Sequence, residues 1–474
     1  MKEAETVKLD SQKKTYTEKV AEFISSTKYN DIPTEAVLIA KNALLDWLGV
    51  SIAGSKESGA RIVADYIRKS KAKRDSTVIC QGLKTTAEFA ALANGNIGHS
   101  IDFDDTNPES AHYNMHPSTC VIPAVLAVAE KYHKSGRQML AGYIVGMEII
   151  SRVCAAIGAA SSQNGWHPTP VIGSIGTAAA CANLLELNQL QTRYALGLAA
   201  SLAGGLRYNF GSMTKPLHAG NAARNGVFAA ELAAGGFTSN PNIFDGDDSF
   251  CRMFGGGKPI AGLLGEELDL GKQWRLVTYG IGFKYYPSCR STHTSIDATR
   301  YLRNKYNINP DQIAEIICQI NLHHLNMAKF IKPETGYQGK FSIPYCIATA
   351  LRSGNVMLSD FTDDKVKDTA TQEIIAKVKF IPSQPAKGGI VELGAEITIR
   401  LKNGETYSQR VSSPKGEPEN PISDEELAGK FEDCSSLILN KREISTVLRL
   451  VRSIEKSEDL TPLFNIIVKS PKAG

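Results

Sequence analysis

Apolar residues recur at helical spacing over most of residues 16–234. Residues from about Tyr16 to Ser51 predict two helices, separated by a break at residues 30–33 that ends in the helix-start residue Pro33. Further segments with the same period predict helices over residues 60–68, 87–97, 120–134, 139–157, 172–187, 191–203 and 221–234. Many of these segments carry Ala and Gly on their apolar faces, and small residues allow helices to pack closely. The pattern predicts a compact all-helical domain.

The pattern changes near Gly271, where shorter segments with alternating apolar residues begin. The predicted elements are a strand at KYYPSCR (284–290), a helix over 294–306, a strand over 313–324, helices over 343–352 and 363–377, and a hairpin at VELGAEITIRL and ETYSQRV. The turn Lys402-Asn403-Gly404 joins the two strands of the hairpin. These elements predict a smaller α+β domain that spans about residues 278–420.

The segment GEPENPIS (416–423) has the composition of a linker, and Ser423 with Glu426 forms a capping box that predicts a new helix. The last fifty residues read as amphipathic helices with no later partner, so we expect them to return to the first domain. The predicted domains are therefore residues 15–277 together with 421–470, and residues 278–420.

Composition excludes several classes of protein. The chain has 474 residues, 42% apolar and 22% charged, with a net charge of +4 and no long basic run, as in a globular protein that does not bind nucleic acid. The nine cysteines form no CxxC pair, which indicates reduced, mostly buried thiols. Residues 1–14 are polar and no run of eighteen apolar residues occurs. We therefore expect a cytoplasmic protein without a signal peptide or membrane span.

The segment GHSIDFDDTNPESAHYNMHPS (98–118) concentrates most of the candidate chemistry. It lacks helical and strand periodicity, and apolar helices are predicted on both sides of it. Its titratable residues include Asp102, Asp104, Asp105, His99, His112 and His116. One interpretation is a solvated surface loop, and another is a divalent-metal site. We favour a catalytic loop held between core helices.

Two further segments of the first domain carry cationic or titratable groups. In GWHPT, His167 lies between a glycine turn and the start of a predicted helix, where it either caps the helix or binds an anion. In GSMTKPLHAGN, which we interpret as a short loop, Lys215 and His218 are followed closely by Arg224. Three basic groups near glycines favour a carboxylate-binding site, although a surface lysine is the alternative.

A third segment, KYYPSCRSTH, contains Lys284 and Cys289 and opens the second domain. It is either an edge strand that ends at a proline or a part of the site. The chain has no GxGxxG after a strand, no GxxxxGK[ST], no HExxH and no GxSxG, so the common nucleotide, zinc-protease and serine-hydrolase signatures are absent.

Together, these motifs resemble the MmgE/PrpD family. The likeness extends over nearly the whole chain, through LDWLGVSIAG, HSIDFDDT, HPS, GWHPT, TKPLHAGNAARNG, KYYPSC with its following TH, KFSIPYCIA and GEPENPIS. The resemblance implies a mainly α fold, with a large all-helical domain built from both chain ends and an inserted α+β lid. It also implies a homodimer that needs no cofactor, and the basic groups of the other segments suit an anionic substrate better than a metal ion.

Within the family, DFDDT, WHPT and KPLH resemble the cis-aconitate decarboxylases more than the 2-methylcitrate dehydratases or the iminodisuccinate epimerases. The resemblance implies a lyase that converts cis-aconitate to itaconate. Dehydration of 2-methylcitrate, epimerisation of iminodisuccinate and an inactive binding protein remain alternatives.

The resemblance also implies pocket residues, which are Asp102, Thr106, His116, His167, Lys215 and Tyr345. With Cys289, His218 and Lys284 from the segments described above, the expected catalytic residues are Asp102, His116, Lys215, Cys289 and Tyr345, and the expected substrate-binding residues are Thr106, His167, His218 and Lys284. His116 is the expected proton donor, with Cys289 or Tyr345 as the alternative acid. Cys289 departs from the animal decarboxylases, which have histidine there, so this departure leaves the source of the proton open.

Overall fold

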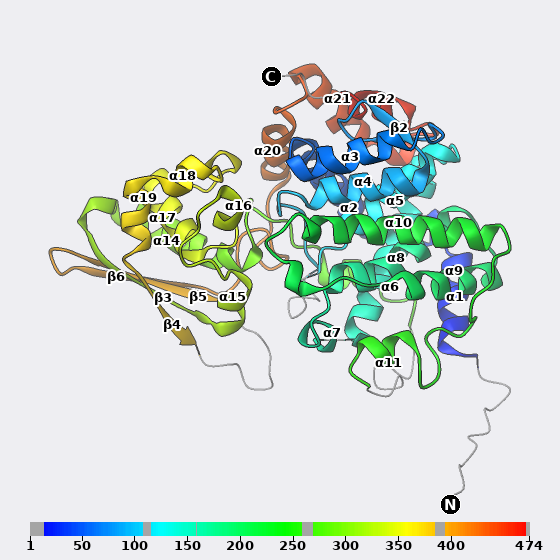
Figure 1. Cartoon of the computed structure of the whole chain (residues 1–474), viewed down its shortest axis with the longest axis horizontal. Helices are drawn as coiled ribbons and strands as arrows, with labels where there is room; N and C mark the ends of the chain where they lie inside the picture. The colour runs from blue at the N-terminus through cyan, green and yellow to red at the C-terminus, as the bar shows by residue number, and fades with distance from the viewer. Residues whose placement is uncertain (1–13, 108–114, 158, 258–268, 384–393, 471–474) are drawn as a thin grey trace, which may run out of the picture.

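The computed structural model describes residues 14–107, 115–157, 159–257, 269–383 and 394–470. Figure 1 shows a large helical domain and a smaller domain beside it, with helix α20 (Asp424–Ser435) at the side of the large domain that faces the small one. Helices from the start and the end of the chain form the large domain, and the middle of the chain forms the small one. The predicted mainly α fold with a small sheet domain is confirmed.

The helical domain consists of a long run of helices with one short hairpin. Its N-terminal elements are α1 (Tyr16–Ser26), α2 (Thr34–Gly54), α3 (Ser58–Lys69), β1 (Ser76–Val78), β2 (Leu83–Thr85), α4 (Ala87–His99), α5 (Ser118–Lys131), α6 (Gly136–Ile157), α7 (Ala160–Gln163), α8 (Pro168–Leu184), α9 (Gln189–Leu202), α10 (Thr214–Ala234), α11 (Phe250–Phe254) and α13 (Arg275–Tyr279). Each helix predicted from periodicity is present, most within three residues of its predicted bounds. The β1–β2 hairpin carries too short a pattern to have been predicted.

Helix α10 is the exception, because it begins at Thr214 rather than near residue 221. The sequence GSMTKPLHAGN was interpreted as a loop, partly because it contains Pro216. Proline is tolerated in the first turn of a helix, where its missing N–H would have no partner within the helix. Lys215 and His218 therefore lie on the first turns of a rigid helix and not in a loop.

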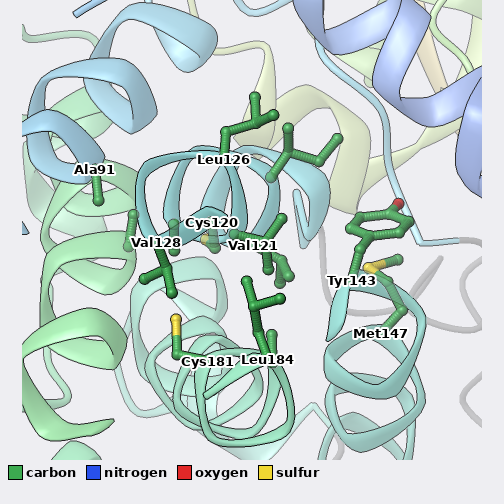
Figure 2. Close-up of a cluster of buried hydrophobic side chains, with 14 of the residues drawn as sticks. Ala91, Cys120, Val121, Leu126, Val128, Tyr143, Met147, Cys181 and Leu184 are labelled. Atoms are coloured by element: carbon green, nitrogen blue, oxygen red, sulfur yellow. The ribbon is translucent and has the colours of Figure 1, made fainter. Parts of the chain in front are cut away.

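Helices α4, α5, α6 and α8 enclose the centre of the helical domain. Figure 2 shows Val121 and Leu126 of α5, Tyr143 of α6 and Leu184 of α8 in this cluster, and all are buried. Helices α6 and α8 cross closely: a Cβ on Gly146 would lie 2.8 Å from the Gly176 carbonyl oxygen. This contact confirms that small residues allow the helices to approach closely.

The small domain has its own buried core, with residues from Tyr286 to Ile399. Its elements are α14 (His293–Tyr306), β3 (Ile313–Asn321), α15 (Leu322–Met327), α16 (Gly336–Gly339), α17 (Ile343–Ser353), α18 (Asp363–Lys367), α19 (Thr369–Ile375), β4 (Val378–Ser383), β5 (Ala395–Leu401) and β6 (Thr406–Val411). The sheet has the order β4-β3-β5-β6, with β3 parallel to β4 and the other pairs antiparallel. The predicted hairpin is β5–β6.

Three predictions for this domain were wrong in detail. Residues 284–290 form bends and the start of a short 3-10 helix instead of a strand; Pro287 lacks an N–H, and the Cys289 N–H bonds the Lys340 carbonyl instead of a strand partner. The strand that was predicted to reach residue 324 ends at Asn321, whose side chain caps α15. The helix predicted over residues 363–377 is divided at Asp368, which caps α19.

The chain returns to the helical domain after residue 421. The capping box of Ser423 and Glu426 is confirmed, because each side chain accepts a hydrogen bond from the backbone N–H of the other residue. Helix α20 packs on α2, where Phe431 lies against Gly49. Helices α21 (Lys441–Arg452) and α22 (Thr461–Ile467) contribute to the main core.

Two helices, α2 and α6, are long and apolar enough to span a membrane. Their apolar windows are 78% and 94% buried within the protein, as expected for core helices of a globular domain. All nine cysteines are buried and free.

Candidate active site

The loop after α4 is buried, which excludes the surface-loop interpretation for its described part. Residues 99–107 are all shielded from solvent, and His112 lies outside the described residues. Asp102, at the centre of the loop, has a φ of +54°, in the left-handed region that side chains other than glycine rarely adopt. Surrounding contacts must therefore hold this backbone in place.

Three lysines supply those contacts, and we refer to them as the lysine clamp. Lys340 donates to the carbonyl of Ile101, Lys284 to that of Asp102, and Lys430 to that of Phe103, at 3.0, 2.7 and 2.9 Å. Two of these lysines come from the small domain and Lys430 comes from α20. The docking of the small domain is thereby coupled to the position of Asp102.

Asp102 is also the centre of a buried charge cluster. Its Oδ1 lies 2.5 Å from the Lys215 ammonium and 3.3 Å from that of Lys284. Burial alone would raise the pKa of Asp102, but attraction to the two lysines outweighs burial and holds this pKa well below its ordinary value. The same pairing outweighs burial at Lys215 and raises its pKa. Asp102 and Lys215 therefore remain an ion pair across the physiological range.

A second network orients His116. Its Nδ1 lies 2.9 Å from the Asp105 carbonyl and 3.2 Å from Asp104, whose carboxylate also receives His99 at 2.9 Å. Both partners of His116 Nδ1 are acceptors, so this nitrogen carries the proton and Nε2 is the free ring position. Burial lowers the pKa of His116 to about 4. His116 is therefore neutral in this structure at physiological pH.

His167 is held at the start of α8 by a second histidine. Its Nδ1 lies 3.1 Å from Nδ1 of His218, and among the described residues its Nε2 has no partner. Burial, with Lys215 as the next cause, lowers the pKa of His167 far below its ordinary value, and burial lowers that of His218 to about 4. His116 and His167 are thus uncharged in this structure and act as hydrogen-bonding groups.

Behind the loop, Asp105 is tied to the core of the helical domain. The Ser118 hydroxyl contacts the Asp105 carboxyl group and lies 2.7 Å from the hydroxyl of Tyr143. Burial, partly offset by Ser118 and reinforced by the nearby Asp46, raises the pKa of Asp105 to about 8. Asp105 is therefore mostly protonated at neutral pH and serves as a structural hydrogen-bonding group.

Asp105→Asn is expected to have a higher free energy of unfolding than the wild type, and this difference should grow as pH rises from about 4 to about 8. Within this window the folded protein retains a proton on Asp105 that the unfolded chain has released, so the wild type loses stability as pH rises, by up to about 1.4 kcal/mol per pH unit. The variant lacks this loss. Urea unfolding of both proteins at several pH values measures the difference, and parallel pH profiles would show that Asp105 is ionised when folded.

The groups around Asp102 enclose a small cavity between the two domains. The cavity is lined by Asp102, His116, His167, Phe210, Lys215, Lys284, Cys289, Arg290, Met327 and Phe341. Its volume is about 10 Å³, room for about one water molecule. A larger ligand can enter only if the small domain moves away or the lining side chains rearrange. The structure therefore encloses the site between the two domains.

Six of the nine expected site residues line this cavity: Asp102, His116, His167, Lys215, Lys284 and Cys289. His218 lies behind His167. Thr106 forms a backbone bridge with Gly282 and is outside the lining. The Tyr345 hydroxyl donates to the Asp360 carbonyl in the core of the small domain, so the structure does not bring this expected acid to the cavity.

The cluster has the ligand types of a metal site. His99, Asp102, Asp104 and His116 each offer an atom within 4.8 Å of the others. However, two ammonium groups already approach Asp102, and His99 and His116 both direct Nδ1 towards Asp104. A divalent cation would have to displace the lysines against their charge repulsion, so the arrangement suits a bound anion better.

Activity is expected to survive dialysis against EDTA, because lysines and hydrogen-bonding histidines supply the charge complement of an anionic substrate. The measurement compares turnover before and after chelation, with metal analysis of the dialysed protein. Loss of turnover that one added divalent cation restores would instead assign a metal to the cluster.

Three residues of the site were not identified from the sequence: Lys340, Lys430 and Arg290. Arg290 lines the cavity, and Lys340 and Lys430 hold the loop that carries Asp102. Lys340 and Arg290 lie inside the motifs KFSIPYCIA and KYYPSCRSTH. Their place in these motifs was the only feature of the sequence that could have indicated a role in the site. Nothing in the sequence around Lys430 distinguishes it from a surface lysine of an amphipathic helix.

The fold and the site define a two-domain protein with a buried, lysine-rich site for a small anion between the domains. The profiles of the MmgE/PrpD N-terminal and C-terminal domains match residues 18–262 and 286–456. The chain belongs to the MmgE/PrpD family, as its motifs predicted.

Several curated relatives match over nearly their whole length. The chain is 28% identical to the cis-aconitate decarboxylase of Homo sapiens, over 96% of this chain and 95% of that protein. It is 29% identical to the cis-aconitate decarboxylase of Mus musculus, with coverages of 96% and 93%. It is 26% identical to the cis-aconitate decarboxylase of Aspergillus terreus, with coverages of 96% and 97%.

Proposed function

We propose that this protein is a cofactor-independent lyase that decarboxylates cis-aconitate to itaconate. The observation that carries the proposal is the closed cavity in which Lys215 and Lys284 flank Asp102, with His116 and Cys289 in the same lining. The names of the full-length relatives support the choice of substrate.

The reaction consumes one proton and releases carbon dioxide. The bond from the methylene carbon to its carboxylate breaks. The electron pair of this bond is delocalised over the adjoining double bond, which gives an allylic carbanion. Protonation at the former alkene carbon then yields itaconate. The developing negative charge lies beside a carboxylate, where Lys215 and Lys284 stabilise it most strongly in the transition state. The apolar side chains Phe210, Met327 and Phe341 suit the release of carbon dioxide, the apolar product of the reaction.

His116 is our candidate for the proton donor, although burial keeps it neutral in this structure. A substrate with three negative charges favours the protonated imidazole, so binding is expected to raise the pKa of His116 and to load Nε2 with a proton. Cys289 is the alternative donor, because burial raises the pKa of its thiol and keeps it protonated. Lys215 is a weak acid beside Asp102 and serves instead to bind a carboxylate.

The test is to incubate the purified protein separately with cis-aconitate, 2-methylcitrate and iminodisuccinate and to follow each reaction by NMR. Itaconate from cis-aconitate is the expected product. Turnover of 2-methylcitrate or of iminodisuccinate alone would assign the protein to another activity of the family. No turnover of any of the three would support an inactive binding protein.

We further propose that the protein is cytoplasmic and works as a homodimer. The family resemblance supports the second proposal, because members of the MmgE/PrpD family are usually homodimers. Light scattering on the eluted protein measures the mass directly, and a monomer would exclude the dimer.

A further inference from the structure

Arg290 is a cavity-lining cation with its own carboxylate partner. It begins a 3-10 helix (Arg290–Thr292) immediately after Cys289 and is 7% exposed. Its Nε lies 2.5 Å from Oε1 of Glu417, a residue of the segment that joins the small domain to α20. Glu417 is 5% exposed. The cavity is therefore bordered by a buried ion pair in addition to the Asp102 cluster.

The pairing leaves most of the guanidinium available. Arginine has five N–H donors in a planar fork. Among the described residues, only the Nε–H of Arg290 has a hydrogen-bond partner. Gly282 leaves room for the Glu417 carboxylate, because a Cβ at this position would lie 2.9 Å from each of its oxygens. The Cys289 N–H bonds the Lys340 carbonyl at 2.8 Å and fixes the backbone next to Arg290. Both partners are thus pre-positioned, with donors of Arg290 directed to no described residue.

The two lysines of the cavity and Arg290 present different binding geometries. Lys215 and Lys284 approach the same Asp102 oxygen and therefore serve one region of the cavity. Arg290 is bound to a different carboxylate on a different segment. A guanidinium can bind a carboxylate through two parallel hydrogen bonds, which a lysine ammonium cannot match. The lining therefore has two separate centres for carboxylates.

We propose that Arg290 binds one carboxylate of the substrate and selects tricarboxylates over dicarboxylates, with Glu417 as the residue that positions it. This inference rests on the proposed function, because it assumes that the cavity holds a carboxylate substrate. Lys215 and Lys284 bind the carboxylate groups near Asp102, and Arg290 binds the remaining one. A ligand that lacks this third group leaves the fork of Arg290 without an acceptor.

The test measures binding rather than turnover, by calorimetry with two unreactive probes. Tricarballylate has three carboxylates, and glutarate has the same chain without the central one. The wild type is expected to bind tricarballylate at least about tenfold more tightly. Arg290→Lys, which keeps the charge but loses the fork, should lose most of this preference while the affinity for glutarate changes less than about threefold.

Two further variants separate recognition from folding. Arg290→Gln alone would leave Glu417 buried without a cation, so it is combined with Glu417→Gln, which removes both charges. The double variant should also lose the preference for tricarballylate. Arg303→Gln is the matched control, because Arg303 donates to the Leu351 carbonyl inside the small domain and does not line the cavity. Its preference should equal that of the wild type.

The outcomes distinguish this inference from the proposed function. If Arg290→Lys and the double variant bind both probes as the wild type does, the ion pair is only structural and the inference is overturned, whether or not cis-aconitate is decarboxylated. Equal affinity of the wild type for the two probes also overturns it. If the wild type binds neither probe, the inference is overturned, and the turnover of cis-aconitate decides the proposed function separately.

Discussion

Replacing Lys215 with alanine is expected to raise KM for cis-aconitate by about 100-fold. The Lys215 ammonium lines the cavity, and its pKa is raised by Asp102, so it carries a full positive charge when the substrate binds. Its loss removes a fixed cation that already binds a carboxylate in the ground state, so most of the effect falls on KM, and the stabilisation that grows in the transition state falls on kcat. A smaller fall in kcat should accompany the rise in KM. Steady-state kinetics over a wide range of substrate concentration separates the two effects.

Two controls accompany this variant. Lys215→Arg keeps a cation beside Asp102 and should retain part of the affinity. Lys69→Ala removes an exposed lysine at the end of α3, and its kinetics should match those of the wild type. A KM for Lys215→Ala within threefold of the wild-type value, in a protein that remains folded, would place the substrate carboxylates elsewhere.

Replacing His116 with alanine is expected to lower kcat by roughly 10²–10⁴, the usual contribution of a general acid. The ring is anchored through Nδ1 by Asp104 and the Asp105 carbonyl, which leaves Nε2 for the substrate. Because the free imidazole is neutral above about pH 4, the protonated form must arise when the substrate binds. Binding should therefore take up a proton, and calorimetry in buffers of different ionisation enthalpy measures that uptake.

Cys289→Ala serves as the comparison, since its thiol lines the same cavity. If His116 supplies the proton, the cysteine variant should retain kcat within about threefold. Near-normal turnover of His116→Ala together with loss of activity in Cys289→Ala would assign the proton to the small domain instead.

The helices of the large domain were predictable because their apolar period extends over many turns. The stretches that became α6 and α8 are buried almost throughout, and each lies within three residues of its predicted start or end. The start of α10 was missed because Pro216 suggested a loop, although proline is compatible with a first turn. Local rules thus identified the elements better than their boundaries.

The lysine clamp could not be predicted from the sequence. Lys284, Lys340 and Lys430 are far apart in the chain, yet they donate to three successive carbonyls of one loop. Lys340 and Lys430 are ordinary in their own segments, and Lys284 was expected only as a substrate-binding residue. Only the packing of the two domains brings the three ammonium groups together. A hydrogen bond to a backbone carbonyl does not depend on the residue type, so the sequence of the loop does not indicate these contacts.

The expected site residues also differ in how well the sequence placed them. Lys215 and His116 carried a chemical signal in their motifs, and the structure places both at the cavity. Tyr345 was named through the resemblance alone, and its hydroxyl is engaged by Asp360. A motif indicates that a segment is near the site, but the direction of each side chain depends on the local backbone and its partners.

The central claim is that this cavity decarboxylates cis-aconitate through protonation of the former alkene carbon. Proton NMR of cis-aconitate with the protein in D₂O tests it most directly. The expected product is itaconate whose vinylidene protons keep their full intensity and whose methylene carries one deuterium. Unchanged cis-aconitate, or a hydrated product in place of itaconate, would contradict the claim.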